Sequence, residues 1–340
     1  MNKYPTQPKR RLTWYNRGMK NTSTFASQKA YIPTQTSLGN SILCYQRFQW
    51  LNSDIVVKTL ARFLRPRPRQ KGRKGYDKIV MFQWLMYKQL MGCSYRDLES
   101  MAHIDYSTFI KFRKRLMEKL WFSRIFKQLT KEIIAQRESL VLIVDSSFVQ
   151  SFSKGKSKEQ GAEYSGYKEK TGFKLHQIID YETRLPLMQR TTPGARPDVV
   201  YGRNLVRGAP KSWSKKVKVF LADKGYDAED FVLQIKRKWA SCDIGIPFRM
   251  MPQQILTEEG YRALKSINRN LNPELLNKRG EIERYFSRKK EVFLLGEEKT
   301  RHLKNFRANC HFTAIMEILE WLSKDDHLWV LFTRLFRVKT

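Results

Sequence analysis

The sequence predicts an α/β protein in which helices flank a mixed five-stranded sheet and a small all-helical region precedes it. From about residue 139, short apolar runs of strand period alternate with stretches of helical period. Between residues 75 and 138 the apolar spacing is helical throughout. The chain has 340 residues, of which 41% are hydrophobic, so two or three domains with real cores are expected and global disorder is not.

The charge of the chain predicts a polyanionic partner. Lys and Arg number 65 against 32 Asp and Glu, which makes a formal net charge of +33. No run of 18 apolar residues predicts a membrane span, and the first residues lack a secretory pattern, so a cytoplasmic location is expected. The four cysteines are scattered without a C-x-x-C pair, which indicates neither a disulfide framework nor a thiolate zinc site.

Residues 1–74 have the composition of a basic, largely irregular arm. They hold 16 Lys or Arg and a single acid, Asp54. Residues 65–75 alternate cations with prolines, which keep the backbone extended. Arg67 and Arg69 in this stretch are candidates to follow a phosphate backbone or to lie in a minor groove. The alternative is a solvated linker that adds only nonspecific affinity.

Residues 75–138 are expected to form a helical region that binds DNA. Helices are predicted over about 76–91, 94–101, 108–120 and 122–134. Three helices with a basic third member can pack as a helix-turn-helix-like unit whose third helix faces DNA. The cations expected on the exposed side of that helix are Lys111, Arg113, Lys114 and Arg115. A plain helical bundle with a solvated cationic face explains the region equally well.

Residues 139–325 are expected to form an α/β domain, followed by a C-terminal tail over 326–340. The segments with strand character are 140–144, 173–180, 186–190, 217–222 and 242–247. The segments with helical character lie near 199–206, 228–239, 280–294 and 311–322. Three consecutive strands, followed by alternating helices and strands, describe a mixed sheet with helices on its faces.

Two acids follow apolar strands of the predicted sheet. Asp145 comes after residues 140–144, and Asp223 after residues 217–222. Ligands of open sheets bind just past the carboxyl ends of strands, so both carboxylates are candidates for a common site. Each could instead cap a following turn. A P-loop is excluded, because the only G-K-S string, at residues 155–157, has Gln150 where the first loop glycine should stand.

A third acid comes from the helix predicted over residues 278–293. At about 100° per residue, Arg279, Glu283 and Lys290 form one polar stripe. An apolar stripe lies directly beside it, formed by Ile282, Phe286 and Phe293. Glu283 therefore lies at the edge of the buried face, whereas Glu281 points away. The alternative is an ordinary amphipathic helix in which Arg279 and Glu283 form an intrahelical ion pair.

Three carboxylates in a basic crevice suit metal-assisted phosphodiester chemistry. They can hold two hard divalent ions about 3.5 to 4 Å apart, which activate a water or a 3′-hydroxyl and stabilise the leaving oxygen. Magnesium prefers oxygen ligands and keeps several waters, so three acids without His or Cys are the expected protein share. Asp145, Asp223 and Glu283 are thus the predicted ligands of two Mg²⁺ or Mn²⁺ ions.

Sequence motifs around these acids follow one another in a fixed order. They are Val144-Asp145-Ser146-Ser147, Gly172-Phe173-Lys174-Leu175-His176, Ala222-Asp223-Lys224-Gly225-Tyr226-Asp227 and the stripe of Arg279, Glu283 and Lys290. In this order and spacing the chain, from about Gly75 to Leu322, resembles the DDE-type transposases of insertion sequences, in particular the insertion-sequence four and five groups. The resemblance implies an RNase H-like catalytic domain.

The last signature of that family is Tyr, two residues, Arg, three residues, Glu, six residues, Lys. Arg279, Glu283 and Lys290 keep this spacing, but Leu276 stands at the tyrosine position. The family often has His-Asp after the third strand, where this chain retains only the acid, Asp198. Asp198 is therefore a secondary candidate. Two further secondary candidates that could line the crevice are Lys174 and His176.

The resemblance implies a transposase that binds the ends of its element and catalyses DNA strand cleavage and strand transfer. Arg279 and Lys290 are then expected to contact DNA phosphates or to orient Glu283. The implied partners are double-stranded DNA, both terminal inverted repeats and target, and further copies in a dimer or larger assembly, nucleoid-associated in a prokaryotic cytoplasm. Two alternatives stay open: an RNase H-like nuclease without strand transfer, and an inactive basic nucleic-acid-binding protein.

Overall fold

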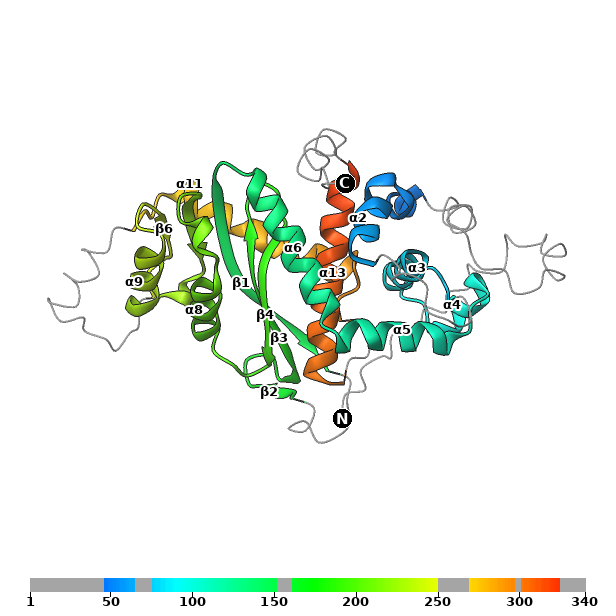
Figure 1. Cartoon of the computed structure of the whole chain (residues 1–340). Helices are drawn as coiled ribbons and strands as arrows, with labels where there is room; N and C mark the ends of the chain where they lie inside the picture. The colour runs from blue at the N-terminus through cyan, green and yellow to red at the C-terminus, as the bar shows by residue number, and fades with distance from the viewer. Residues whose placement is uncertain (1–45, 65–74, 152–160, 250–268, 297–300, 325–340) are drawn as a thin grey trace, which may run out of the picture.

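The computed structural model describes residues 46–64, 75–151, 161–249, 269–296 and 301–324. A group of helices and a sheet with its own flanking helices lie on the two sides of one long helix, α13 (Leu303–Lys324) (Figure 1). Residues of α13 belong to the apolar core of both parts: Phe312 and Leu319 pack with the helical group, and Phe306 packs with the sheet. The helix therefore ties the two parts together.

The helical part has the elements that the apolar spacing predicts, with one addition. Its helices are η2 (Gln46–Asn52), α2 (Asp54–Leu64), α3 (Lys78–Met91), α4 (Tyr95–Ala102), α5 (Tyr106–Glu118) and α6 (Trp121–Gln136). Asp77 caps the start of α3, and Gly92 ends it in the left-handed conformation with φ 64°. Ser94 and Asp97 form a capping box at the start of α4.

The addition lies inside the stretch expected to be a largely irregular arm. Within residues 1–74 the structure describes 46–64, and these form η2 and α2 instead of irregular chain. Leu51, Val56 and Leu60 are fully buried against the helical core. Val56 and Leu60 have the i, i+4 spacing of one face of α2, but the surrounding cations and polar residues dominate the composition of this stretch. Arg67 and Arg69, like the tail expected over 326–340, lie outside the described residues.

The sheet is mixed and has β1 (Leu140–Gln150) near its centre. On one side β1 pairs antiparallel with β3 (Lys170–Asp180), which also pairs with β4 (Pro186–Pro193) and the short β2 (Glu163–Ser165). On the other side β1 pairs parallel with β5 (Val217–Ala222), and β5 with β6 (Asp243–Gly245). This confirms the predicted mixed sheet and adds β2, which makes six strands among the described residues.

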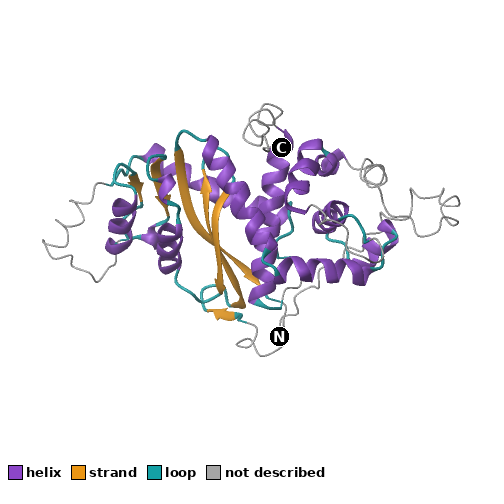
Figure 2. Ribbon diagram, in the orientation of Figure 1, coloured by secondary structure: helices purple, strands orange, loops and turns teal. Residues whose placement is uncertain are grey.

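Helices cover both faces of the sheet (Figure 2). One face packs against α8 (Asp198–Gly208) and α9 (Glu229–Lys238), and the other against α12 (Glu281–Glu291) and α13. The helix expected over 280–294 is thus α12, preceded by α11 (Pro273–Asn277) and the single turn η5 (Lys278–Gly280). The helix expected over 311–322 begins earlier, at Leu303, because its first turns pack on the sheet.

The central strand β1 is longer than its apolar run predicts. It continues from Val144 to Gln150 because β3 pairs with it along this whole length. Asp145 therefore lies within a strand and not just past its end. On the other side the pairing with β5 stops at Val144, opposite Ala222, so Asp145 still stands where the parallel part of the sheet ends.

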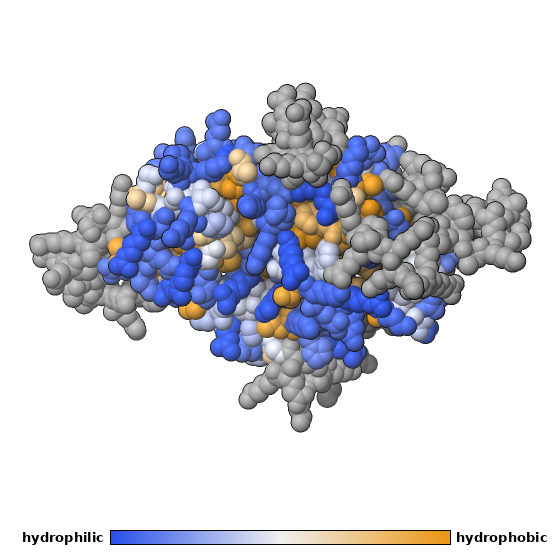
Figure 3. Space-filling view, in the orientation of Figure 1, coloured by the Kyte–Doolittle hydropathy of each residue, from blue (hydrophilic) through white to orange (hydrophobic). Residues whose placement is uncertain are grey.

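Hydrophilic side chains predominate on the surface that the space-filling view presents (Figure 3). In the part of the chain that the structure describes, none of the helices is both apolar and long enough to cross a membrane.

The burial of α2 leads to a test of its place in the core. Replacing the fully buried Leu60 with Ala should lower the free energy of unfolding by about 2–5 kcal/mol, because the cavity it leaves lies in the helical core. Gln49→Ala, at an exposed position of η2, serves as the control and should change it by no more than about 0.5 kcal/mol. Denaturant unfolding measures both, and equal effects would show that α2 does not belong to the core.

Candidate active site

Asp145 and Asp223 lie side by side at the end of the two central parallel strands. Ile143 is in register with Leu221, and Val144 with Ala222. The residues that come next along the two chains, Asp145 and Asp223, therefore lie at the same level of the sheet. Because side chains alternate along a strand, Asp145 shares the face of Ile143, which is the face that α12 covers. Each carboxylate accepts a hydrogen bond from the backbone N–H that follows it, at Ser146 (2.7 Å) and Lys224 (2.6 Å).

Helix α12 brings the third acid to the same face. The guanidinium of Arg279, in the turn before α12, lies 3.5 Å from a carboxylate oxygen of Glu283 and 4.0 Å from one of Asp223. The intrahelical ion pair considered above is therefore present, but the same cation also reaches the acid that follows β5. Arg279 thus connects the acid of the helix with an acid of the sheet.

The electrostatic state of Asp145 reflects this gathering of acids. Its pKa is raised to about 6, first because burial disfavours the charged carboxylate and then because the charges of Asp198 and Asp223 act on it. The hydrogen bond from Ser146 and the charge of Arg279 oppose the increase. A cation bound near Asp145 would therefore favour the charged form of its carboxyl group and lower its pKa.

Tyr226 is a residue of this site that the sequence analysis did not predict, although it lies in the motif Ala222-Asp223-Lys224-Gly225-Tyr226-Asp227. It is only 2% exposed and ends the turn η4 (Lys224–Tyr226) that follows Asp223. Burial raises its pKa well above the usual value, and the charges of Asp145, Asp198 and Asp223 raise it further. The phenol therefore lies within electrostatic reach of three acids. Gly202 of α8 makes room for it, because a Cβ there would stand 2.8 Å from the tyrosine ring.

Asp198, Lys174 and His176 form a cluster next to this site. Lys174 Nζ lies 2.9 Å from a carboxylate oxygen of Asp198, and His176 Nδ1 lies 3.5 Å from the same oxygen. His176 is in register with Ser146, so it lies on the sheet face opposite to Asp145 and stacks on Tyr201. Burial lowers the pKa of His176 to about 4 despite the nearby Asp198. These three residues hold the start of α8 against the sheet.

The two glutamates at the start of α12 have different surroundings. The side chain of Glu281 is 11% exposed and pairs with Arg184 and Arg284, so cations already satisfy it. Glu283 is 66% exposed, and Arg279 is its ion-pair partner. Lys290 is exposed at the far end of the stripe, and partial burial and the charge of Lys168 lower its pKa. The expectation that Glu281 points away from the buried face is therefore wrong, and of the two acids Glu283 is the one available to a ligand.

The cations expected to face DNA on α5 divide into two kinds. Lys111, Lys114 and Arg115 are exposed. Arg113 instead points inward, where it donates a hydrogen bond to the hydroxyl of Tyr95 (2.9 Å) and another to Asn309 of α13. Arg113 therefore fixes α5 to its neighbours, and the three exposed cations remain candidates for phosphate contacts.

The comparisons with known proteins bear on the same stretch of chain. A family model described as the transposase DDE domain matches residues 136–319, more than half of the sequence. The chain belongs to the DDE transposase domain family. It is thus a member of a family of DNA-processing proteins, and the match begins just before β1 and ends within α13.

Similar solved structures are also transposases. A cryo-EM structure of the piggyBac transposase synaptic complex with hairpin DNA has 12% sequence identity and a TM-score of 0.36, covering 87% of this chain and 84% of that one. A crystal structure of the mariner Mos1 paired-end complex with Mg has 11% identity and a TM-score of 0.18, covering 82% of this chain and 98% of that one. A comparison with curated proteins found no match.

The acids of this transposase domain have the donor chemistry of a divalent-ion site. Asp145, Asp223 and Glu283 offer carboxylate oxygens alone, and the raised pKa of Asp145 marks a place where a cation would be stabilised. Across the described residues, no three Asp, Glu, His or Cys side chains stand close enough together to hold an ion as they lie. Arg279 is the cation that now stands between Asp223 and Glu283.

The raised pKa of Asp145 predicts a site that opposes folding when no metal is added. With EDTA at pH 7.5, Asp145→Asn should raise the free energy of unfolding by up to about 3 kcal/mol, because the folded protein then no longer holds a buried carboxylate beside two others. The folded-state pKa lies above the unfolded one, so wild-type stability falls as the pH rises from about 4 to 6.

The difference between variant and wild type should therefore shrink as the pH is lowered from 6 toward 4. Asp243→Asn, at an exposed acid of β6, is the control and should change the stability by no more than about 0.5 kcal/mol at any of these pH values. Denaturant unfolding at pH 4.5, 6 and 7.5 provides the measurement. A variant no more stable than wild type at pH 7.5 would contradict the interpretation of Asp145.

Proposed function

We propose that this chain is a transposase that cleaves DNA at the ends of a mobile element and joins the ends to a target. One observation carries the proposal: Asp145 and Asp223 stand level on adjacent strands, and Arg279 links Asp223 to Glu283 across the same face. The three acids come from parts of the sequence far apart, and their order is that of the family to which the chain belongs. A cytoplasmic, nucleoid-associated location is part of the proposal.

Each residue of the site has a role in this proposal. Asp145, Asp223 and Glu283 would hold two Mg²⁺ or Mn²⁺ ions, which supply an activated oxygen nucleophile and stabilise the leaving oxygen. Arg279 pairs with Asp223 and Glu283 until substrate binds, and its guanidinium can then form bidentate hydrogen bonds with a phosphate. Lys290, at the other end of the stripe, is placed to bind a further phosphate. Asp198 adds negative charge near Asp145, and Tyr226 remains a neutral phenol near the acids because its pKa is raised.

The DNA that the acids would repel is held by cations elsewhere on the chain. The net charge of +33 supplies an attraction that does not depend on sequence. On the helical part, Lys111, Lys114 and Arg115 form an exposed face on α5, which follows α4 after a short turn. This helix is the proposed DNA-facing member of a helix-turn-helix-like unit.

Removing any one of the three acids should abolish metal-dependent cleavage. Asp145→Ala, Asp223→Ala and Glu283→Ala should each lower the nicking rate on element-end DNA by at least about a hundredfold, because each takes away a metal ligand. DNA binding should stay within about threefold of wild type, since the variants lose no cation. Gel-based nicking assays with added Mg²⁺, together with filter binding, measure the two quantities.

Glu291→Ala is the matched control, because Glu291 is an exposed acid of the same helix whose hydrogen-bond partner is Ser287. It should nick like wild type. If all three acid variants still nick DNA, the assignment of Asp145, Asp223 and Glu283 as metal ligands is wrong. Supplying pre-cut 3′-hydroxyl ends separates the alternatives: joined product supports a transposase, nicking without joining supports a nuclease, and no reaction in either assay supports an inactive DNA-binding protein.

The phosphate contacts also predict a steep salt dependence of binding. Each neutralised phosphate contributes about −0.9 to the slope of log affinity against log salt, so five contacts give about −4.5. We expect a slope of at least this steepness for duplex DNA between 50 and 200 mM salt. Fluorescence anisotropy gives the slope, and an affinity that hardly changes over this range would argue against DNA as the main partner.

A further inference from the structure

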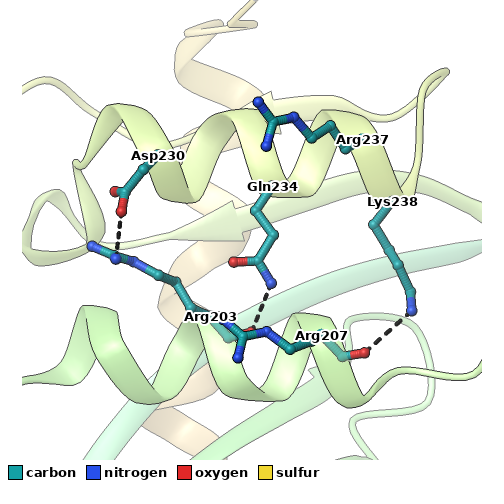
Figure 4. A pocket seen from close by; sticks show the side chains of 6 residues that line it. All are labelled: Arg203, Arg207, Asp230, Gln234, Arg237 and Lys238. Atoms are coloured by element: carbon teal, nitrogen blue, oxygen red, sulfur yellow. Dashed lines mark hydrogen bonds and ion pairs between the residues drawn. The ribbon is translucent and has the colours of Figure 1, made fainter.

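A groove lies between α8 and α9, on the sheet face opposite to the one that α12 covers. It has a volume of about 460 Å³, and its lining residues are Arg203, Arg207, Asp230, Gln234, Arg237 and Lys238 (Figure 4). Four of them are cations and one is an acid. The two helices run in the same direction, because Asp230 near the start of α9 meets α8 upstream of the place where Lys238, at the end of α9, meets it.

The contacts in this groove leave two arginines without a partner. Arg203 is paired with Asp230, and Gln234 donates a hydrogen bond to the carbonyl of Arg203 (2.9 Å), which fixes the helices to each other. Lys238 donates to the carbonyl of Arg207 (3.3 Å), as a cation at a helix C-terminus often does. The guanidinium groups of Arg207 and Arg237 have no hydrogen-bond or ion-pair partner among the described residues, and both residues are exposed.

Helix capping therefore accounts for the position of Lys238. It does not account for the positions of the guanidinium groups of Arg207 and Arg237. Both groups line the same groove and are exposed, so an anion bound there could meet two guanidinium groups. A guanidinium offers donors in a planar fork that matches the oxygens of a phosphate. The chemistry of the groove thus fits a phosphate-bearing ligand, and a groove open along its length fits a chain of phosphates.

The length of α8 between the groove and the start of the helix is compatible with duplex DNA as that ligand. Asp198, whose charge acts on Asp145, begins α8, and Arg207 lies near its end, about 14 Å away at 1.5 Å per residue. At 3.4 Å per base pair this distance corresponds to about four base pairs of duplex DNA. The groove and α12 lie on opposite faces of the sheet, so a duplex that reaches both the acids and the groove has to pass the end of β5, where Asp223 stands and where the charge of Asp198 acts on Asp145.

We infer that the groove between α8 and α9 is a second DNA-binding site, in which Arg207 and Arg237 hold backbone phosphates of the duplex that flanks the cleaved phosphodiester. The inference rests on the proposed function, since it assigns the substrate of the same site. It gives the α8–α9 face a task that is separate from cleavage. The groove adds affinity for long DNA and takes no part in the reaction itself.

The double variant Arg207→Ala/Arg237→Ala tests the inference. On a duplex that extends 15 base pairs beyond the nick site on both sides, its affinity should fall about tenfold at 100 mM salt. The salt slope should become shallower by about 1.8, or 0.9 for each of two lost phosphate contacts. Two further duplexes are each shortened to two base pairs beyond the nick, one on each side of it. With one of the two, the affinity of the variant should equal that of wild type. The nicking rate at saturating DNA should not change.

Two comparisons make the result specific to the groove. Lys127→Ala/Lys131→Ala removes two exposed cations from α6 and should lower affinity for long DNA by no more than about threefold. Arg207→Lys/Arg237→Lys keeps the charge and should recover part of the affinity. Equal losses in the Arg207/Arg237 and Lys127/Lys131 alanine variants, or losses equal on long and short duplexes, would overturn the inference. If the wild-type protein nicks DNA and the Arg207→Ala/Arg237→Ala variant binds long DNA as tightly as wild type, the inference about the groove is wrong and the proposed function stands. If the wild-type protein neither binds nor nicks DNA, the proposed function is wrong as well.

Discussion

The structure of this site depends on holding one mostly buried carboxylate, that of Asp145, close to other negative charges. Two parallel strands with a fixed register bring Asp145 and Asp223 to the same level and the same face of the sheet. Neighbouring negative charges and partial burial both disfavour ionisation, and the raised pKa of Asp145 expresses the balance. Arg279 offsets part of this effect, because its charge lowers the pKa of Asp145 and its guanidinium lies 4.0 Å from Asp223. These carboxylates are oxygen donors of the kind that the proposed divalent ions require.

The helix that carries Glu283 is held against the sheet by a buried ionic network. Lys289 and Glu317 are 0% and 2% exposed and lie 2.8 Å apart, and the hydroxyl of Tyr285 donates to the same carboxylate. Removing one member of such a pair typically destabilises a protein by about 3–5 kcal/mol, so the network fixes α12 on α13 firmly. Because α13 also packs in the helical core and binds Arg113 of α5, it supports both the proposed DNA-facing helix and α12, which carries Glu283.

The positive charge of the chain is distributed around these acids in different structural roles. Arg113 points inward and Arg203 is paired with an acid, so each holds elements of the fold together. The exposed cations of α5 and the unpartnered arginines of the α8–α9 groove lie on separate surfaces. A count of basic residues indicates a polyanionic partner, but only the contacts of each side chain separate the cations that bind DNA from those that stabilise the protein.

Local periodicity was enough to predict the mixed sheet, the helices from α3 to α6, and the stripe of Arg279, Glu283 and Lys290, because each follows from residues close together in the chain. The length of β1, the burial of α2 and the place of Tyr226 among three acids were decided by the tertiary structure. Each depends on a partner distant in sequence: β3 extends β1, α13 and α3 cover α2, and Gly202 makes room for Tyr226. A single sequence shows which side chains are apolar or charged and so need to be buried or paired. Only the tertiary structure determines which residues bury or pair with each of them.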